Sequence, residues 1–258
     1  MLNGIFSGLI PNIPQMLLML PAIFISLSVH EAAHGFAAYK LGDPTAHNLG
    51  RLTLNPIKHI NPIGFVCMML FGVGWATPVP VNTRNFKNPR RDMAITAAAG
   101  PLSNLLLSLI FTLLLRLVLI PLQNMAEGQY LLLPNNSYYL ADGIASDTAF
   151  LLLSVLAIIF YLGIILNLSL MIFNLIPLPP LDGSRIAYIF MPPRLYFGIM
   201  KYERYIMWGF LILLWLGIID LPLGFITGGI RNGLFWLTGM PEDLLTVITS
   251  NIYNRFSI

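Results

Sequence analysis

A long apolar stretch at residues 14–40 reads PQMLLMLPAIFISLSVHEAAHGFAAYK and places His30, Glu31 and His34 inside a segment long enough to cross a bilayer. On a helix, His30 and His34 lie on one face, one turn apart, so both imidazoles can reach a single ion. Glu31 then lies beside that ion, where it can take a proton from a bound water. Ionisable side chains within a membrane segment are costly and are normally kept for a function. We therefore predict one zinc ion per chain, since zinc accepts imidazole and carboxylate ligands and keeps a position open for water.

A second polar cluster follows a long apolar run, at residues 174–183, which read NLIPLPPLDG. Its three prolines end a helix and allow the backbone and the Asp182 carboxylate to turn back into the protein interior. A catalytic zinc site usually has three protein ligands, so we expect Asp182 to join His30 and His34. Taken in isolation, the same aspartate would be an ordinary helix cap beside Gly183.

The composition indicates an integral membrane protein. Of 258 residues, 57% are hydrophobic and only 10% are charged, whereas soluble domains are about a quarter charged. This excludes a water-soluble globular fold and a disordered chain. The single cysteine, Cys67, excludes a scaffold built on internal disulfides. The net charge of +3 is explained by basic loops at the cytoplasmic face, so nucleic acid is not an expected partner.

The fold class that follows is an α-helical polytopic membrane protein with about five to six membrane segments. Four stretches are clear candidates for spanning helices, at residues 14–40, 93–121, 148–176 and 205–221. Residues 60–80 are apolar but rich in proline and glycine, which predicts a small re-entrant or β-hairpin element inside the protein. Residues 222–258 fit either a final span or an interfacial helix. We expect residues 1–258 to form one domain.

The loops between the predicted spans alternate in charge. Residues 40–92 contain seven Lys and Arg against two Asp, and residues 185–204 contain four Lys and Arg against one Glu. Residues 122–147, in contrast, contain three acidic residues and no basic one. Because basic loops stay inside, the first and third of these loops are predicted to be cytoplasmic. His30, His34 and Asp182 then all lie toward the cytoplasmic side of the cell membrane.

The two polar clusters together, His30-Glu31-x-x-His34 and Asn174…Pro177…Asp182-Gly183, resemble the site-2 protease family of intramembrane zinc metalloproteases. The chain is similar to the compact prokaryotic branch of this family, which has no PDZ or CBS domain. Four further stretches carry that similarity: GDPTA at 42–46, GRLTLNP at 50–56, PVPVN at 78–82 and AGPLSN at 99–104. The similarity runs from about residue 20 to 190, within a catalytic core expected at about 14–190.

The resemblance implies both a function and a site. It makes His30, His34 and Asp182 the ligands of one zinc ion. It makes Glu31 the general base and Asn174 a residue that binds the substrate or the developing oxyanion. The implied enzyme is a metalloendopeptidase that cleaves transmembrane protein or peptide substrates among membrane lipids. It also implies that residues 63–82 form a membrane-associated hairpin whose edge pairs with an extended substrate.

Some alternatives stay open from the residues alone. A zinc hydrolase of a non-peptide substrate, an inactive membrane scaffold or chaperone, and a metal transporter are each compatible with an intramembrane metal site. A transporter, however, would spread polar ligands through the membrane thickness.

His47 and His59 are expected to be solvated loop residues. Asn61 stands where many relatives have an aspartate, and Asn104 is expected to hydrogen-bond between helices.

Overall fold

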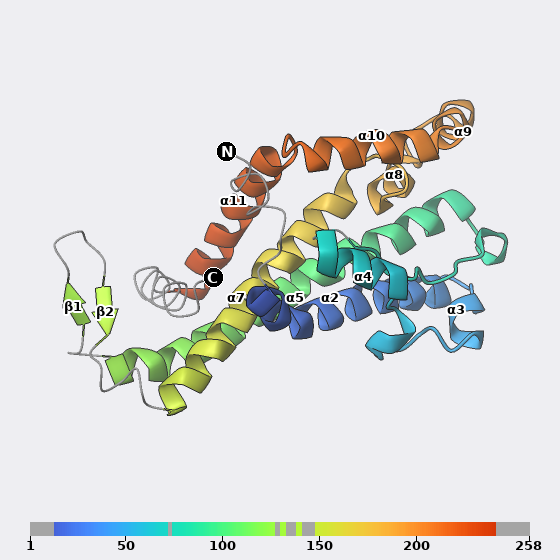
Figure 1. The fold of residues 1–258 in the computed structure, drawn as a ribbon. Coiled ribbons are helices and arrows are strands. Elements are labelled where there is room, and N and C mark those ends of the chain that lie inside the picture. Colours follow the sequence, from blue (N-terminus) through green and yellow to red (C-terminus); the bar gives the residue numbers. More distant parts are fainter. Residues whose placement is uncertain (1–12, 72–73, 127–129, 133–137, 141–147, 241–258) are drawn as a thin grey trace.

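The computed structural model describes residues 13–71, 74–126, 130–132, 138–140 and 148–240. Three long helices form its centre: α2 (Ile13–Lys40), α5 (Pro89–Ala126) and α7 (Thr148–Leu175) (Figure 1). All three are long and apolar enough to cross a membrane, and no other helix among the described residues is. These helices confirm an α-helical membrane protein and match the first three predicted spans.

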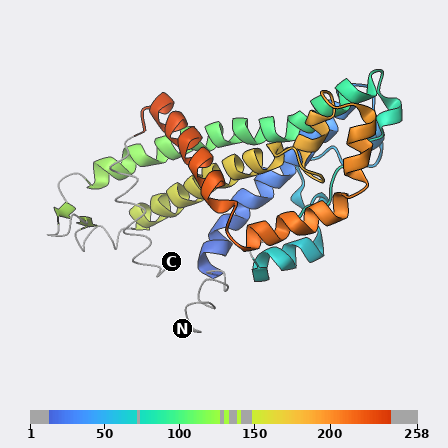
Figure 2. The same ribbon diagram turned by 90° about the horizontal axis from the view of Figure 1, so that it is seen from above.

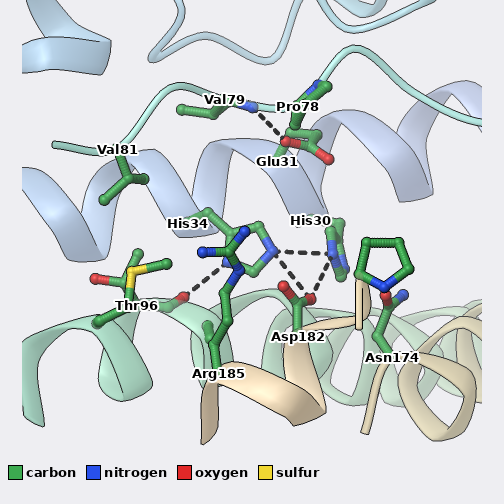
Figure 3. A pocket seen from close by; sticks show the side chains of 13 residues that line it. His30, Glu31, His34, Pro78, Val79, Val81, Thr96, Asn174, Asp182 and Arg185 are labelled. Carbon is green, nitrogen blue, oxygen red and sulfur yellow. Dashed lines mark hydrogen bonds and ion pairs between the residues drawn. The ribbon is translucent and has the colours of Figure 1, made fainter. Parts of the chain in front are cut away.

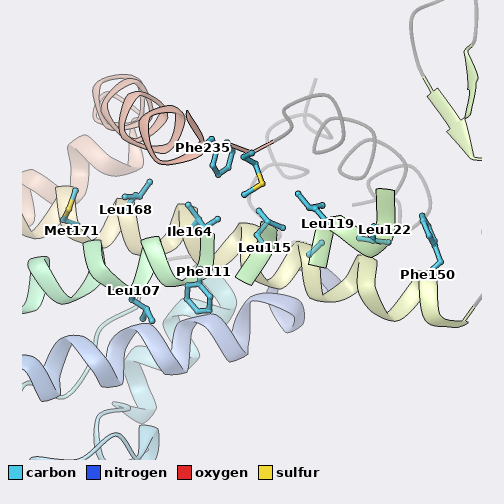
Figure 4. Close-up of a cluster of buried hydrophobic side chains, with 12 residues drawn as sticks. Leu107, Phe111, Leu115, Leu119, Leu122, Phe150, Ile164, Leu168, Met171 and Phe235 are labelled. Atoms are coloured by element: carbon cyan, nitrogen blue, oxygen red, sulfur yellow. The ribbon is translucent and has the colours of Figure 1, made fainter. Parts of the chain in front are cut away.

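The apolar core lies mainly between α5 and α7 (Figure 4). The α5 contribution repeats every three or four residues, which places it on one helical face: Leu107, Phe111, Leu115, Leu119 and Leu122. Facing it are Phe150, Ile164, Leu168 and Met171 of α7, with Phe235 added from α11 (Asp220–Thr238). This contact runs along most of both helices, so the polar residues at one end of the bundle are held in a fixed register.

The connecting segments gather at the two ends of the bundle (Figure 1). Most of the short segments from the two basic loops lie toward one end, and they are α3 (Thr45–Asn48), η1 (Pro56–Lys58), η2 (Thr83–Asn85), α8 (Asp182–Ala187) and α9 (Pro193–Met200). A short antiparallel pair, β1 (Tyr130–Leu132) and β2 (Tyr138–Leu140), lies at the other end. The two basic loops therefore lie mostly toward one end of the bundle, and the described part of residues 122–147 lies at the other.

The region predicted as a re-entrant segment or a β-hairpin begins with a helix, α4 (Pro62–Phe71). Asn61 starts it, because its side-chain oxygen accepts a hydrogen bond from the Gly64 N–H at 2.9 Å. Residues 74–82 are extended, with a single isolated bridge between Ile60 and Ala76. The β-hairpin alternative is therefore wrong for the described residues. The residues after Pro62 do not alternate between apolar and polar side chains, as a half-buried strand would. Asn61 can cap a helix as well as an aspartate at this position would.

The predicted span at 205–221 is also wrong as one continuous helix. Helix α10 (Glu203–Trp215) has 13 residues, about 20 Å of helix, which is shorter than the hydrocarbon layer of about 30 Å. Gly217 ends it with φ +69°, and the Ile218 N–H bonds back to the Leu213 carbonyl at 3.1 Å, as in a Schellman cap. Helix α11 then turns away from α10 and packs against α7 and α5 (Figure 2). The predicted tail beyond residue 240 lies outside the described residues.

The cap at Gly217 predicts opposite effects for two glycine substitutions. Gly217→Ala forces a side chain into the left-handed region and should lower the free energy of unfolding by about 1 kcal/mol. Gly209→Ala, inside α10 with open space around its Cα, should raise it by about 0.5–1 kcal/mol. Denaturant unfolding of both variants in one detergent measures this. Equal effects of the two substitutions would contradict the assignment of the helix end.

Candidate metal centre

Three side chains that the sequence singled out meet in the structure (Figure 3). His30 and His34 come from α2, and Asp182 is the first residue of α8. The two Nε2 atoms lie 3.0 Å apart, and the Asp182 Oδ2 atom lies 3.3 Å from His30 Nε2 and 3.2 Å from His34 Nε2. Among the described residues, this is the one group of three His, Cys, Asp or Glu whose ligand atoms converge.

The other ring nitrogens of both histidines are held by α5. His34 Nδ1 lies 2.7 Å from the Thr96 carbonyl oxygen, and His30 Nδ1 lies 3.3 Å from Asn104 Oδ1. A carbonyl oxygen only accepts, so Nδ1 of His34 must carry a proton, and the Asn104 oxygen selects the same tautomer for His30. In their neutral form, both rings direct the lone pair of Nε2 toward Asp182. Such outer contacts orient metal-binding histidines.

The α5 face toward α2 is a stripe with a spacing of four residues: Thr96, Gly100 and Asn104. Helices α2 and α5 run in opposite directions (Figure 1), so Thr96 meets His34 and Asn104 meets His30. Gly100 lies between them, where an added Cβ would be 2.4 Å from His34 Nε2 and 2.6 Å from His30 Cε1. The site exists because this position of α5 has no side chain.

The convergence of donor atoms fits a metal ion. Two imidazole lone pairs and a carboxylate oxygen point at one another, and no proton separates them in these tautomers. Asp182 Oδ2 is also buried without a hydrogen-bond partner among the described residues. Ligands bound at about 2.0–2.1 Å in a tetrahedral site lie about 3.3 Å apart, close to the observed separations. A cation between the three atoms would remove their repulsion and satisfy the carboxylate.

Asp182 reaches this position because α7 stops close to it. The proline-containing segment 176–181 turns the chain from the end of α7 directly into α8. There the two helices are in tight contact, since a Cβ at Gly183 would lie 2.3 Å from the Leu175 carbonyl oxygen. The Asp182 carboxylate therefore enters the bundle from the end of α7.

Glu31 lies beside the three converging groups but turns toward an extended segment. Its Oε2 atom accepts a hydrogen bond from the Val79 N–H at 2.8 Å, which leaves Oε1 for another partner. The side chain is largely buried, with 9% of the residue exposed. A cavity of about 350 Å³ opens here, and Asn174 of α7 and Arg185 of α8 also line it.

The extended segment that carries Val79 is fastened on both sides. Arg51 donates to the Thr77 carbonyl oxygen at 2.7 Å. Asp43, fully buried, accepts hydrogen bonds from the Asn82 N–H and from the Asn85 Nδ2 atom, both at 2.7 Å.

Burial alone would raise the pKa of the Asp43 carboxyl, but these hydrogen bonds and those from Thr45 hold its pKa below the ordinary value. The charged form of Asp43 thus keeps the segment in place.

The model of Peptidase family M50 matches residues 18–216. The chain belongs to Peptidase family M50. "Putative zinc metalloprotease YwhC" of Bacillus subtilis (strain 168) is 40% identical to this M50 member over 202 residues, which are 78% of this chain and 80% of the relative.

More distant curated relatives have longer chains. "Putative zinc metalloprotease Rip2" of Mycolicibacterium smegmatis is 26% identical over 201 residues, or 76% of this chain and 64% of that protein. Rip2 of Mycobacterium tuberculosis (strain H37Rv) is 28% identical over 165 residues, or 62% of this chain and 51% of that protein. No solved structure matches the chain significantly.

The remaining predicted residues of this M50 peptidase have mixed outcomes. His47 is exposed and stacks on the Tyr39 ring at 5.0 Å, in agreement with a solvated position. The same prediction for His59 is wrong: it is 1% exposed, and its Nε2 donates to the Thr53 carbonyl oxygen at 2.8 Å. It is buried because its own loop folds over it. Neither residue is in the metal cluster. Asn104 does hydrogen-bond between helices, as predicted, but to a metal-binding candidate.

Three features that shape the site were not predicted from the sequence: the α5 face that holds both histidines, the Val79 N–H, and the place of Arg185 in the cavity. The spacing of Thr96, Gly100 and Asn104 is visible in the sequence and could have identified the face of α5 that meets α2. The Val79 N–H gives no sequence signal, because it is a backbone group placed by contacts of distant residues. Arg185 is one of the four basic residues counted in its loop, and it also lines the cavity.

The close approach at Gly100 predicts a specific loss. Gly100→Ala places a methyl group against both imidazoles, so the affinity for added zinc should fall about tenfold or more. Leu102→Ala, on an exposed side of the same helix, should bind zinc as the parent does. Isothermal titration of the metal-stripped proteins with zinc compares them. Unchanged affinity in Gly100→Ala would contradict the observed packing.

The clamp at Asp43 predicts a pH-dependent stability difference. A carboxyl whose pKa is lowered by folding stabilises the folded state above its unfolded pKa of about 3.9 and loses this effect as the pH falls further. Asp43→Asn should therefore unfold at a lower temperature than the parent at pH 7, and the difference should shrink below about pH 4. Thermal unfolding across pH tests this. A difference that is constant with pH would contradict a role for the charge.

Proposed function

We propose that this chain is a zinc-dependent intramembrane endopeptidase that hydrolyses peptide bonds of transmembrane protein or peptide substrates. The observation that carries the proposal is the convergence of two imidazoles and a carboxylate, with Glu31 beside them, within the helical bundle. Membership in Peptidase family M50 and relatives named as zinc metalloproteases support it. The apolar helix α2, which carries two of the three groups, is a candidate membrane span and supports chemistry within or near the bilayer.

His30, His34 and Asp182 would hold one zinc ion per chain, and the cavity beside them would admit water or substrate. When bound, zinc supplies a Lewis acid that polarises the scissile carbonyl and acidifies the attacking water. Thr96 and Asn104 keep the two imidazoles in the tautomer that binds metal.

Glu31 would serve as the general base. The Val79 N–H holds one of its carboxylate oxygens, so the other is free to accept a proton from the attacking water. Glu31 would then deliver that proton to the nitrogen of the leaving amine as the C–N bond breaks. The group needs no metal contact for this task, and none of its oxygens belongs to the metal cluster.

Asn174 would bind the substrate or the developing oxyanion. Its Nδ2 atom donates one hydrogen to the Leu170 carbonyl at 2.9 Å, which fixes the amide and leaves the second hydrogen for another acceptor. The residue lines the same cavity as Asp182. An amide donor there stabilises negative charge on the scissile carbonyl oxygen.

The extended segment 77–82 is suited to bind an extended substrate along its edge. Proteolysis needs an unwound substrate, and this segment lies against Glu31. Pro78 and Pro80 have no N–H, so the segment itself offers few donors to a partner strand.

For the membrane arrangement, we take α2, α5 and α7 as full spans and α4 as a re-entrant segment. Helices α10 and α11 would account for the remaining membrane segments, giving five to six in all. The basic loops share one end of the bundle, which would face the cytoplasm. His34 is six residues from the end of α2 at Lys40, so the site would lie about 9 Å from that end.

The proposed role of Glu31 is tested by an isosteric change. Glu31→Gln removes the base but keeps the shape, so cleavage of a transmembrane test peptide should fall at least 1000-fold, on the order expected for losing general base catalysis. Zinc content should stay at the parental value. Glu203→Gln, at the start of α10 and outside the cavity, is the matched control. Cleavage is followed by mass spectrometry. Cleavage that survives in Glu31→Gln would contradict the mechanism.

A further inference from the structure

Arg185 is a cation at the candidate site that has no assigned task. It lies on α8, three residues after Asp182, and lines the same cavity. Figure 3 shows its side chain rising alongside His34, whereas Asn174 lies on the side of His30. The two polar side chains therefore flank the converging ligand atoms from opposite sides.

The guanidinium group of Arg185 makes no hydrogen bond or ion pair within the part of the chain that the structure describes. Asp182 would be a natural partner at this helical spacing, but its Oδ2 atom faces the two imidazoles instead. Tyr196 is an ionisable neighbour: the Arg185 charge lowers its pKa, but burial raises that pKa overall. The five N–H donors of an arginine are thus available to a molecule in the cavity.

Other donors in the cavity are scarce. Pro78, Val79 and Val81 form one wall, where Pro78 has no N–H and the Val79 N–H is taken by Glu31. The remaining wall residues are mostly apolar or acidic, and the imidazole protons point away toward α5. Among the described lining side chains, Asn174 and Arg185 have the uncommitted N–H groups. An extended peptide, however, brings a carbonyl acceptor with every residue, and each must be satisfied when buried.

We propose that Arg185 binds the substrate directly, by donating to a main-chain carbonyl oxygen next to the scissile bond on the His34 side of the metal. This inference rests on the proposed peptidase function. It assigns a substrate contact to a residue that is not one of the three proposed zinc ligands. The planar guanidinium can hold two such acceptors in one plane, which a lysine cannot. Arg185 and Asn174 together would fix the peptide on both sides of the bond that is cut.

The test uses binding without turnover. Zinc-loaded Glu31→Gln protein is titrated with a fluorescent single-span peptide that the parent enzyme cleaves, in detergent micelles. Adding Arg185→Gln should raise the Kd about tenfold or more, as for a lost charged hydrogen bond. Arg185→Lys should recover part of the loss. Arg194→Gln, an exposed arginine on α9, is the control and should leave the Kd unchanged.

Zinc content is measured in each variant, because a structural role near Asp182 would lower it. Weaker peptide binding with full zinc content supports the substrate contact. An unchanged Kd in Arg185→Gln overturns it, and so does a loss of zinc that accounts for the weaker binding. If the parent enzyme cleaves the peptide and the Kd is unchanged in Arg185→Gln, only the role of Arg185 is contradicted. If the parent enzyme cleaves no transmembrane peptide, the proposed function is contradicted.

Discussion

Two imidazole nitrogens and one carboxylate oxygen face one another inside a helical bundle. Their separations of 3.0–3.3 Å would be repulsive in a medium of low dielectric constant unless a cation lay between them. The surrounding structure maintains this arrangement rather than relieving it. Helix α5 fixes both rings through Thr96 and Asn104, and the chain reversal after α7 brings in Asp182. The packing of α2, α5 and α7 is thereby tied to metal binding.

The stretches that resemble other site-2 proteases can each be given a physical task. GDPTA contains Asp43, and GRLTLNP contains Arg51 and the Thr53 carbonyl that binds His59. Both stretches hold PVPVN, whose Val79 N–H orients Glu31. AGPLSN supplies the gap at Gly100 and the acceptor at Asn104. Loops outside the bundle therefore set the position of Glu31, while α5 sets the positions of His30 and His34.

The sequence predicted well what depends on composition and local spacing. Three spans, the pairing of His30 with His34, and the arrival of Asp182 beside them follow from apolar run length, helical periodicity and proline placement. The sequence did not predict the structure where a single residue interrupts an apolar pattern, or where segments far apart in the chain come into contact. Gly217 ends α10 inside an apolar run, and a helix replaces the first limb of the expected hairpin. The burial of His59 and the contact from Val79 to Glu31 arise only from the fold.

The central claim is that two motifs about 150 residues apart form one zinc site. Zinc per chain, measured by elemental analysis after purification and reloading, tests it most directly in the parent, Asp182→Ala and Asn174→Ala. Our account predicts one zinc in the parent and in Asn174→Ala, whose side chain lines the cavity without joining the ligand cluster. It predicts a large loss in Asp182→Ala. Full zinc retention in Asp182→Ala would contradict the account.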